Sequence, residues 1–373
     1  MIDAPGPWGT GPFILTEGHS VIDARQAVTS HDPFACIWLP TEDRTPRVRL
    51  MANTGYWDRR RGPRLQEVVF RNDLSPQEAL EAVCTTEGEV DIVTEVPPAQ
   101  AQRVERSEHA ELVSVDAVHA IAGVFDRDAS DVPLHDRRAR QAVNLAVDRE
   151  GLVQETMHGH ARPLAGLTPP TALTVAHRFP RRLRPYPHDP ALAGRLWAAA
   201  GGAAGQTLRI AALEGLEAVA HRVAHDVGAV LGLRAEVRAL EGEEAAEARR
   251  ALAEKDRPHP WHVLIVQQGM QSVDAPPLEL HRAFVGSTGE YRAGPVVPVF
   301  EELYADLPRH TSQAGLVLQA NAIDRFVREQ SLALFLCAPD ALYAVNRHVR
   351  FQPYATTFEL AETEVDDGHW SVR

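Results

Sequence analysis

The chain has 373 residues, of which 44% are hydrophobic, and a formal net charge of −13. This length and composition predict a globular protein of two or three domains with packed cores. The acidic balance argues against a nucleic-acid partner, which would need a cationic face. No apolar run approaches the roughly 20 residues that span a bilayer, so no membrane span is expected.

The cysteine and lysine content allows two further inferences, one about cysteine-based sites and one about the genome. Cys36, Cys84 and Cys337 are widely spaced and odd in number, so neither a disulfide framework nor a thiolate zinc site is predicted. Lys255 is the only lysine among the 38 basic residues, a bias that indicates a GC-rich genome and an actinobacterial-like composition.

Strands alternate with helices in the N-terminal part of the chain. Turn residues lead into a first strand at 9–15, and a long insert separates it from a second strand at 48–52, which together predict a β-hairpin. Ser75 followed by Pro76 is a strong helix start. The pattern then predicts a strand at 65–71, the helix from Ser75, a strand at 88–93, a helix at 98–106 and strands at 112–115 and 120–125. This alternation indicates an α/β lobe.

The middle of the chain predicts a second α/β lobe with its own core. Helices are expected at 136–147, 149–157, 191–200, 218–231 and 243–253, and strands at 208–212, 233–240 and 261–267. Gly201 and Gly202 provide the glycine signal at a helix end. A tail with a helix at 312–329 and strands at 332–336, 341–345 and 349–351 would close the structure.

Five strings in this order carry a resemblance to a known family. They are GTGPF at 9–13, N..YW at 53–57, GEVDI at 88–92, PLHDRRARQAVNLAVDR at 133–149, and Y..DP..A..L..AAG at 186–201. Together they resemble the family 5 (peptide, oligopeptide and nickel type, cluster C) solute-binding proteins of ABC transporters. Most of these residues serve the fold: Asp136 is placed to cap a helix, Arg140 to brace it, and Gly201 to allow a positive φ.

The resemblance implies a fold and a division into lobes. The fold is α/β, a two-lobed periplasmic-binding-protein-like fold of type II with a hinge made by interlobe crossovers. Lobe I would comprise residues 1–121 plus 337–373 and lobe II residues 122–336. A ligand would be held in the cleft when the lobes close.

The start of the sequence departs from the family pattern. Family members carry a signal peptide, first strands and a small subdomain before GTGPF, whereas Met1 stands a few residues ahead of Gly9. We therefore expect the N-terminal subdomain to be absent, and a cytoplasmic location as written, or an extracytoplasmic one if the true start lies upstream.

The predicted ligand residues follow from the resemblance at 261–277. The family usually has G-W-x-x-D-x-x-D-P there, in which the tryptophan lines the pocket and an aspartate can pair with a peptide's amino terminus. Here Gly269 matches, Met270 replaces the tryptophan and Asp274 is the nearest carboxylate. An apolar pocket with one buried carboxylate suits an ammonium group, so Asp274 is the best single ligand residue. A loop aspartate that caps the turn before Pro276 is the alternative.

Three histidines and one tryptophan complete the predicted ligand-binding set. His158 and His160 form an HxH pair near the implied cleft, His119 precedes a strand that borders the hinge, and Trp57 belongs to the N..YW turn. The HxH pair makes His158 and His160 weak metal candidates that need further ligands. Surface or hinge histidines are the alternative, and we predict neither a metal site nor a cofactor.

No catalytic residue is predicted, because the sequence holds no nucleophile elbow, zinc helix or phosphate loop. Cys337 is more consistent with a buried, inert thiol than with a nucleophile. The leading function is capture of a small peptide-like or amino-containing ligand, with an ABC permease or a companion chain that supplies the missing N-terminal part as partner. The alternatives are a shortened cytoplasmic paralogue used as an enzyme or accessory factor in a specialised metabolic pathway, and one half of a split receptor.

Overall fold

The computed structural model describes residues 9–18, 45–116, 118–169, 183–255, 258–269, 278–354 and 358–373. The predicted ligand residues Met270 and Asp274 lie outside these ranges. The chain divides into two compact units, Met1–Val113 with Leu342–Arg373, and Ser114–Ala341. The lobe boundaries that the sequence suggests, at 121/122 and 336/337, remain a prediction. None of the described helices is long and apolar enough to cross a membrane.

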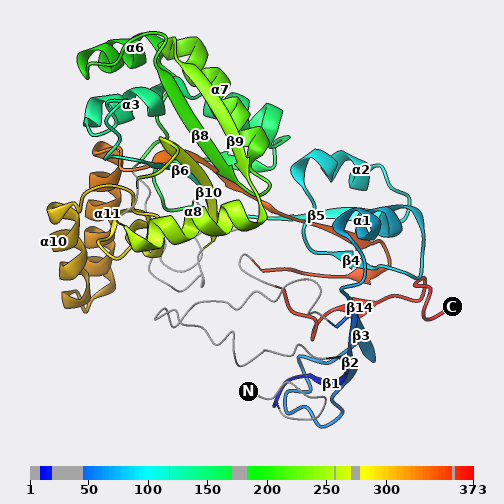
Figure 1. Ribbon diagram of the computed structural model, residues 1–373. Helices are drawn as coiled ribbons and strands as arrows, with labels where there is room; N and C mark the ends of the chain where they lie inside the picture. Colours follow the sequence, from blue (N-terminus) through cyan, green and yellow to red (C-terminus); the bar gives the residue numbers. More distant parts are fainter. Residues whose placement is uncertain are drawn as a thin grey trace. The chain divides into compact units, whose positions relative to one another are not determined.

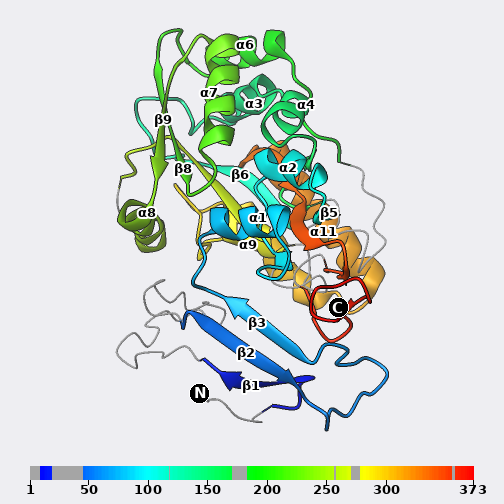
Figure 2. The same ribbon diagram turned by 90° about the vertical axis from the view of Figure 1, so that its right-hand side faces the viewer.

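The first unit contains two three-stranded sheets (Figure 1). One has the order β1-β2-β3, all antiparallel, which confirms the predicted hairpin; Figure 2 shows its three strands side by side. The other has the order β4-β12-β5. The elements of this unit are β1 (Phe13–Glu17), β2 (Arg47–Ala52), β3 (Glu67–Arg71), α1 (Pro76–Thr85), β4 (Ile92–Val93), η3 (Pro98–Gln100), α2 (Ala101–Glu105), β5 (Ala110–Val115), β12 (Ala341–Asn346), β13 (Val349–Arg350) and β14 (Glu364–Val365).

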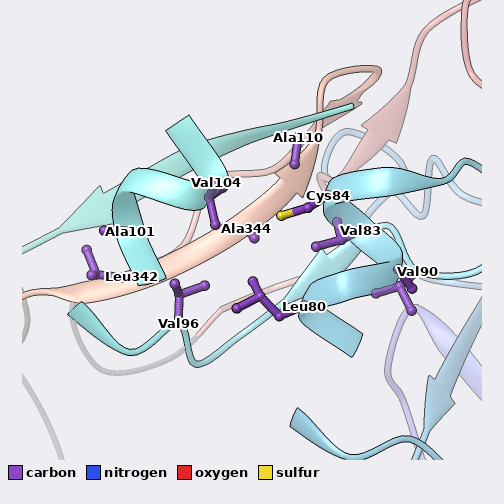
Figure 3. Close-up of a cluster of buried hydrophobic side chains, with 11 residues drawn as sticks. Leu80, Val83, Cys84, Val90, Val96, Ala101, Val104, Ala110, Leu342 and Ala344 are labelled. Atoms are coloured by element: carbon purple, nitrogen blue, oxygen red, sulfur yellow. The ribbon is translucent and has the colours of Figure 1, made fainter. Parts of the chain in front are cut away.

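In the core of this unit, α1 and α2 pack against β5, β12 and the residues Val90 and Val96 that flank β4 (Figure 3). Helix α1 begins where the sequence predicts: the Ser75 hydroxyl accepts from the Glu78 amide, and the Glu78 carboxylate accepts from the Ser75 amide. This reciprocal cap lets α1 present its apolar side to the core. The buried cluster consists of Leu80, Ala82, Val83, Cys84, Val90, Val96, Ala101, Val104, Ala110, Leu342 and Ala344.

Asp91, in the GEVDI string, ties the C-terminal segment to this unit. One of its carboxylate oxygens, Oδ1, accepts from Asn346 Nδ2 at 3.1 Å, from His369 Nε2 at 3.0 Å and from Trp370 Nε1 at 3.0 Å. His369 is buried. A carboxylate that accepts several hydrogen bonds stabilises the folded arrangement more than a neutral acceptor would.

The second unit is built on one six-stranded sheet of order β7-β11-β6-β10-β8-β9. Helix α7 packs along β8 and β9 (Figure 1), and α3 packs against α6. Its strands are β6 (His119–Phe125), β7 (Ala161–Pro163), β8 (Thr207–Leu213), β9 (Arg234–Leu240), β10 (Val263–Gly269) and β11 (Leu334–Pro339). Its helices are α3 (Arg137–Ala146), α4 (Arg149–Gly151), η4 (Leu152–Thr156), α6 (Pro190–Ala199), α7 (Glu217–Leu231), α8 (Gly242–Glu254), α9 (Glu279–Val285), α10 (Pro298–Asp306), η5 (Leu307–Arg309) and α11 (Gln313–Glu329).

Most predicted elements appear, with one correction. The expected helix at 149–157 is present over 149–156, but it is not one α-helix: the chain makes one α-turn at 149–151 and then a π-helix over 152–156. The wider turn buries Leu152 and Val153 while the Glu155 carboxylate contacts Arg222 at 2.6 Å. Strand β7 and helices α9 and α10 are additional elements that the sequence patterns did not reveal.

Two buried arginines of the long motif join α3 to the tail of the chain. Arg149, 3% exposed, donates to the carbonyls of Phe335 at 2.6 Å and Asn144 at 2.7 Å. Arg140 donates to the carbonyls of Ser331 and Gln330, both at 2.9 Å, and also to Leu134 O and His135 O. The Asp136 cap is present as predicted, accepting from the Arg138 amide.

Replacing Arg149 with alanine should destabilise the protein by on the order of 3 kcal/mol or more. Each carbonyl left without a partner costs about 1–3 kcal/mol, and a cavity remains where the side chain lay. Urea unfolding followed by circular dichroism measures the change. Arg137→Ala, at an exposed position of the preceding helix α3, is the matched control and should stay within about 0.5 kcal/mol of the parent. Equal effects of the two substitutions would contradict this account.

Candidate ligand-binding site

One edge of the six-stranded sheet gathers the carboxyl ends of four strands. β10 runs parallel to β8, and β8 runs parallel to β9. β10 and β11 are both antiparallel to β6, and β11 is antiparallel to β7. The carboxyl ends of β8, β9, β10 and β11 therefore lie at the same edge as the starts of β6 and β7. In open α/β sheets, ligands bind beyond the carboxyl ends of strands.

His119 lies at this edge beside the end of β10. It is the cross-strand partner of Gly269, and a Cβ atom added to Gly269 would come within 2.6 Å of the His119 ring. The imidazole therefore lies over the glycine backbone, a position that a larger residue would obstruct. Gly269 is the last described residue before Met270. His119 thus lies beside the end of β10, and the predicted ligand residues Met270 and Asp274 follow β10 in the sequence.

A polar group, of which the sequence indicated only His160, lies at the same edge. We call Ser114, Asp116, His160, Arg162 and Asp340 the edge cluster. Arg162 Nη2 lies 2.5 Å from Asp116 Oδ1, the Ser114 hydroxyl lies 3.5 Å from Asp340 Oδ2, and the Asp340 amide donates to the carbonyl of His160 at 3.0 Å. The one available signal was that Asp340 directly follows the apolar run of β11.

Burial raises the pKa of the Asp340 carboxyl above its ordinary value. The nearby Asp116 carboxylate raises this pKa further, whereas Arg162, His160 and the Ser114 hydroxyl lower it. The net effect disfavours the ionised form. Asp340 is thus a partly buried acid at the edge of the sheet, and an arriving cationic group would reverse the direction of its pKa shift.

The two histidines of the HxH pair lie in different surroundings. His158 is exposed and has a positive φ of 50° at the end of the π-helix, whereas His160 is half-buried and belongs to the edge cluster. Among the described residues, no three His, Cys, Asp or Glu side chains lie together in a way that could hold a metal ion.

The predicted ligand residue Trp57 lies in the first unit. Its side chain is 74% exposed, and its ring centroid lies 5.5 Å from that of the buried Tyr56. Asn53 braces this turn, since its side chain donates to Gly11 O at 3.0 Å and accepts from the Gly55 amide at 3.0 Å. The turn therefore holds an aromatic ring open to solvent, and its role as a ligand contact remains a prediction.

An open depression beside α1 has carboxylates that are already engaged. It is lined by Ser75, Gln77, Glu78, Glu81, Ala82, Thr85, Thr86 and Glu89. Glu78 caps the helix and Glu81 pairs with Arg103. We assign no ligand to this depression, because these acidic groups serve the fold.

Cys337 is unsuited to nucleophilic chemistry. It is fully buried in β11, and burial raises the pKa of its thiol to about 12. Because the thiolate is the reactive form, this side chain stays inert at neutral pH.

Comparison with known proteins places these features in a family. The model of the bacterial extracellular solute-binding proteins, family 5 Middle, matches residues 4–277. The glutathione-binding protein GsiB of Shigella flexneri is 26% identical over 163 residues, which are 44% of this chain and 30% of that protein. The chain therefore spans less than a third of the curated relatives it matches.

Solved structures share the fold at low sequence identity. The substrate-binding protein CtaP of Listeria monocytogenes superposes with a TM-score of 0.76 at 15% identity, covering 96% of this chain and 67% of that one. NikA of Brucella suis, in complex with Fe(III)-EDTA, gives 0.74 at 16% identity, covering 96% and 68%. The dipeptide-binding protein of Pseudoalteromonas sp. SM9913, in complex with Met-Leu, gives 0.70 at 17% identity, covering 96% and 64%. These matches confirm the predicted two-lobed α/β fold class.

Asp340→Asn should raise the melting temperature at pH 7–8 and have little effect near pH 3. The folded-state pKa of this acid is raised, so the folded protein binds the proton more tightly than the unfolded chain does, and stability is lost as pH rises from the unfolded pKa through the folded pKa. The amide cannot ionise and avoids this loss. Thermal melts of both proteins across this pH range test the prediction, and a variant that is less stable at neutral than at acid pH would contradict it.

Proposed function

This chain belongs to the bacterial extracellular solute-binding proteins of family 5, and we propose that it captures a small peptide-like or amino-containing solute for ABC transport. The single observation that carries this proposal is the meeting of His119 and Gly269 at the carboxyl-end edge of the sheet. The names of its relatives supply the ligand class, since they include glutathione-binding and dipeptide-binding proteins.

The proposed contacts divide the ligand into a charged end and an apolar body. Asp274 would pair with an ammonium group, because a buried carboxylate is stabilised most by an opposite charge with good geometry. Met270 and Trp57 would supply apolar contact, and His119 a hydrogen bond. His160, a member of the edge cluster, and the nearby His158 would lie toward the rest of the solute. No step of this proposal requires a covalent reaction.

The proposed partners are an ABC permease and a further polypeptide. The structural neighbours extend about a third of their length beyond the part that this chain matches. A split receptor, in which a companion chain provides a further part, stays an alternative proposal. The binding role is the same in both cases, but a split receptor would acquire full affinity only when its companion is present.

Ligand binding should appear as thermal stabilisation. We expect a dipeptide or glutathione at about 100 times its dissociation constant to stabilise the protein by about 2.7 kcal/mol. Asp274→Asn should abolish most of this shift for ligands with a free amino group and have little effect for N-acetylated ones. Asp367→Asn, at an exposed position, is the matched control and should retain the full shift. Stabilisation by Ni²⁺ alone, without any peptide, would contradict the proposed ligand class.

The family description supports an extracytoplasmic place of action. Fractionation of cells that express the protein from its own locus should recover it outside the cytoplasm or with the membrane. Loss of the gene should then lower uptake of a labelled dipeptide. Recovery in the cytosolic fraction with unchanged uptake would instead favour the shortened cytoplasmic paralogue.

A further inference from the structure

The end of strand β10 carries two adjacent glutamines in different surroundings. β10 lies between β6 and β8 in the six-stranded sheet (Figure 1). Its first four residues, 263–266, are fully buried, whereas Gln267 is exposed and Gln268 is half-buried. Successive side chains of a strand point to opposite faces of the sheet. The apolar strand therefore ends in a pair of side-chain amides, one on each face.

The Gln268 side chain is held by the protein itself. The Tyr291 hydroxyl donates to Gln268 Oε1 at 2.8 Å, and Gln268 Nε2 lies 3.4 Å from the carbonyl oxygen of Gly269. Tyr291 is 4% exposed, and its ring centroid lies 5.1 Å from that of Phe284. A buried hydroxyl needs a hydrogen-bond partner, and Gln268 supplies it. The role of Gln268 is therefore structural.

The Gln267 side chain has no such partner among the residues that the structure describes. Strand residues two positions apart lie on the same face, about 6.6 Å from each other, so Gln267 shares a face with Gly269. Cross-strand partners also share a face, and the partner of Gly269 is His119. The amide of Gln267 thus lies on the His119 side of the edge where the candidate site is located.

We propose that Gln267 is a specificity-determining residue of the solute site and that its side chain hydrogen-bonds an amide group of the bound solute. This inference rests on the proposed function and narrows its ligand class to solutes that contain an amide bond. A primary amide has both donors and an acceptor. A peptide bond offers the matching acceptor and donor, whereas an ammonium group only donates and a carboxylate only accepts.

Covering the Gln267 side chain makes it discriminate between solutes. A bound solute would take this amide out of water, and a polar group that is covered without a partner is costly because its hydrogen bonds are not replaced. A solute with an amide bond replaces them, and a solute without one does not. A site built to hydrogen-bond one group therefore rejects the analogue that lacks it.

The test compares a dipeptide with its ester analogue. The probes are Met-Leu, the dipeptide in the complex of one structural neighbour, and the depsipeptide in which an ester oxygen replaces the amide N–H of Met-Leu. The ester has no N–H donor and a weaker carbonyl acceptor, so a contact with either end of the Gln267 side chain is weakened. We expect the parent protein to bind Met-Leu about tenfold more tightly than the depsipeptide in isothermal titration calorimetry.

Two substitutions separate recognition of the solute from stability. Gln267→Met, similar in size but without hydrogen-bonding groups on its amide position, should remove the preference for Met-Leu and leave the melting temperature unchanged. Gln268→Met is the matched control. It removes the acceptor of the buried Tyr291 hydroxyl, so it should lower the melting temperature and keep the preference. A preference that survives in Gln267→Met overturns the proposal. A loss of stability in Gln267→Met as large as in Gln268→Met would show a structural role and overturn it too.

The outcomes also distinguish this inference from the proposed function. If the parent protein binds Met-Leu and the depsipeptide equally well, solute binding stands and the role of Gln267 fails. If neither of these probes nor glutathione gives measurable binding, the proposed function fails and this inference fails with it.

Discussion

The second unit depends on two guanidinium groups buried without a carboxylate partner. Burial lowers the pKa of Arg140 and of Arg149 to about 10, so both remain charged at neutral pH. A buried charge must be compensated, and here backbone carbonyls from segments almost 190 residues apart provide the compensation. Asn144 completes the set by accepting from the Phe335 amide and from Arg149. These contacts join β11 and the turn before it to α3 and α4, and β11 in turn carries Asp340 to the edge of the sheet where the candidate site lies.

Sequence reasoning succeeded where local chemistry decides the structure. The Ser75 cap with Pro76, the Asp136 cap, and the apolar runs of β8 and β10 each contain their own signal, and the structure confirms them. It failed where the signal was short or distant. β7 has three residues and ends in a proline, too few to establish a period of two. The π-helix over 152–156 has the same apolar and polar periodicity as an α-helix would over so few residues, and its Glu155 contacts Arg222, more than sixty residues away.

The candidate site was only partly predictable for the same reason. His119 could be proposed because it precedes an apolar strand that borders an expected crossing, and the structure sets it against Gly269. The edge cluster could not, because Ser114 and Asp340 are 226 positions apart and meet only when β11 returns to the sheet. The strand order, more than the residue type, determines which polar groups lie close together. The sequence can therefore identify single candidate residues, but not which of them share a site.

The outer strand of the six-stranded sheet is protected by its exposed side chains. The outer strand β9 alternates Arg234, Glu236 and Arg238 on its exposed positions, with smaller apolar residues between them. Such charges discourage pairing with another strand. The β1-β2-β3 sheet has no such division, because Met51 and Val69, which are 38% and 40% exposed, lie on the same side as Arg47, Arg49 and Arg71. Single exposed apolar residues are common on folded proteins, whereas the charges along β9 protect a strand edge, so of the two sheets it is the larger one whose outer strand is adapted to remain unpaired.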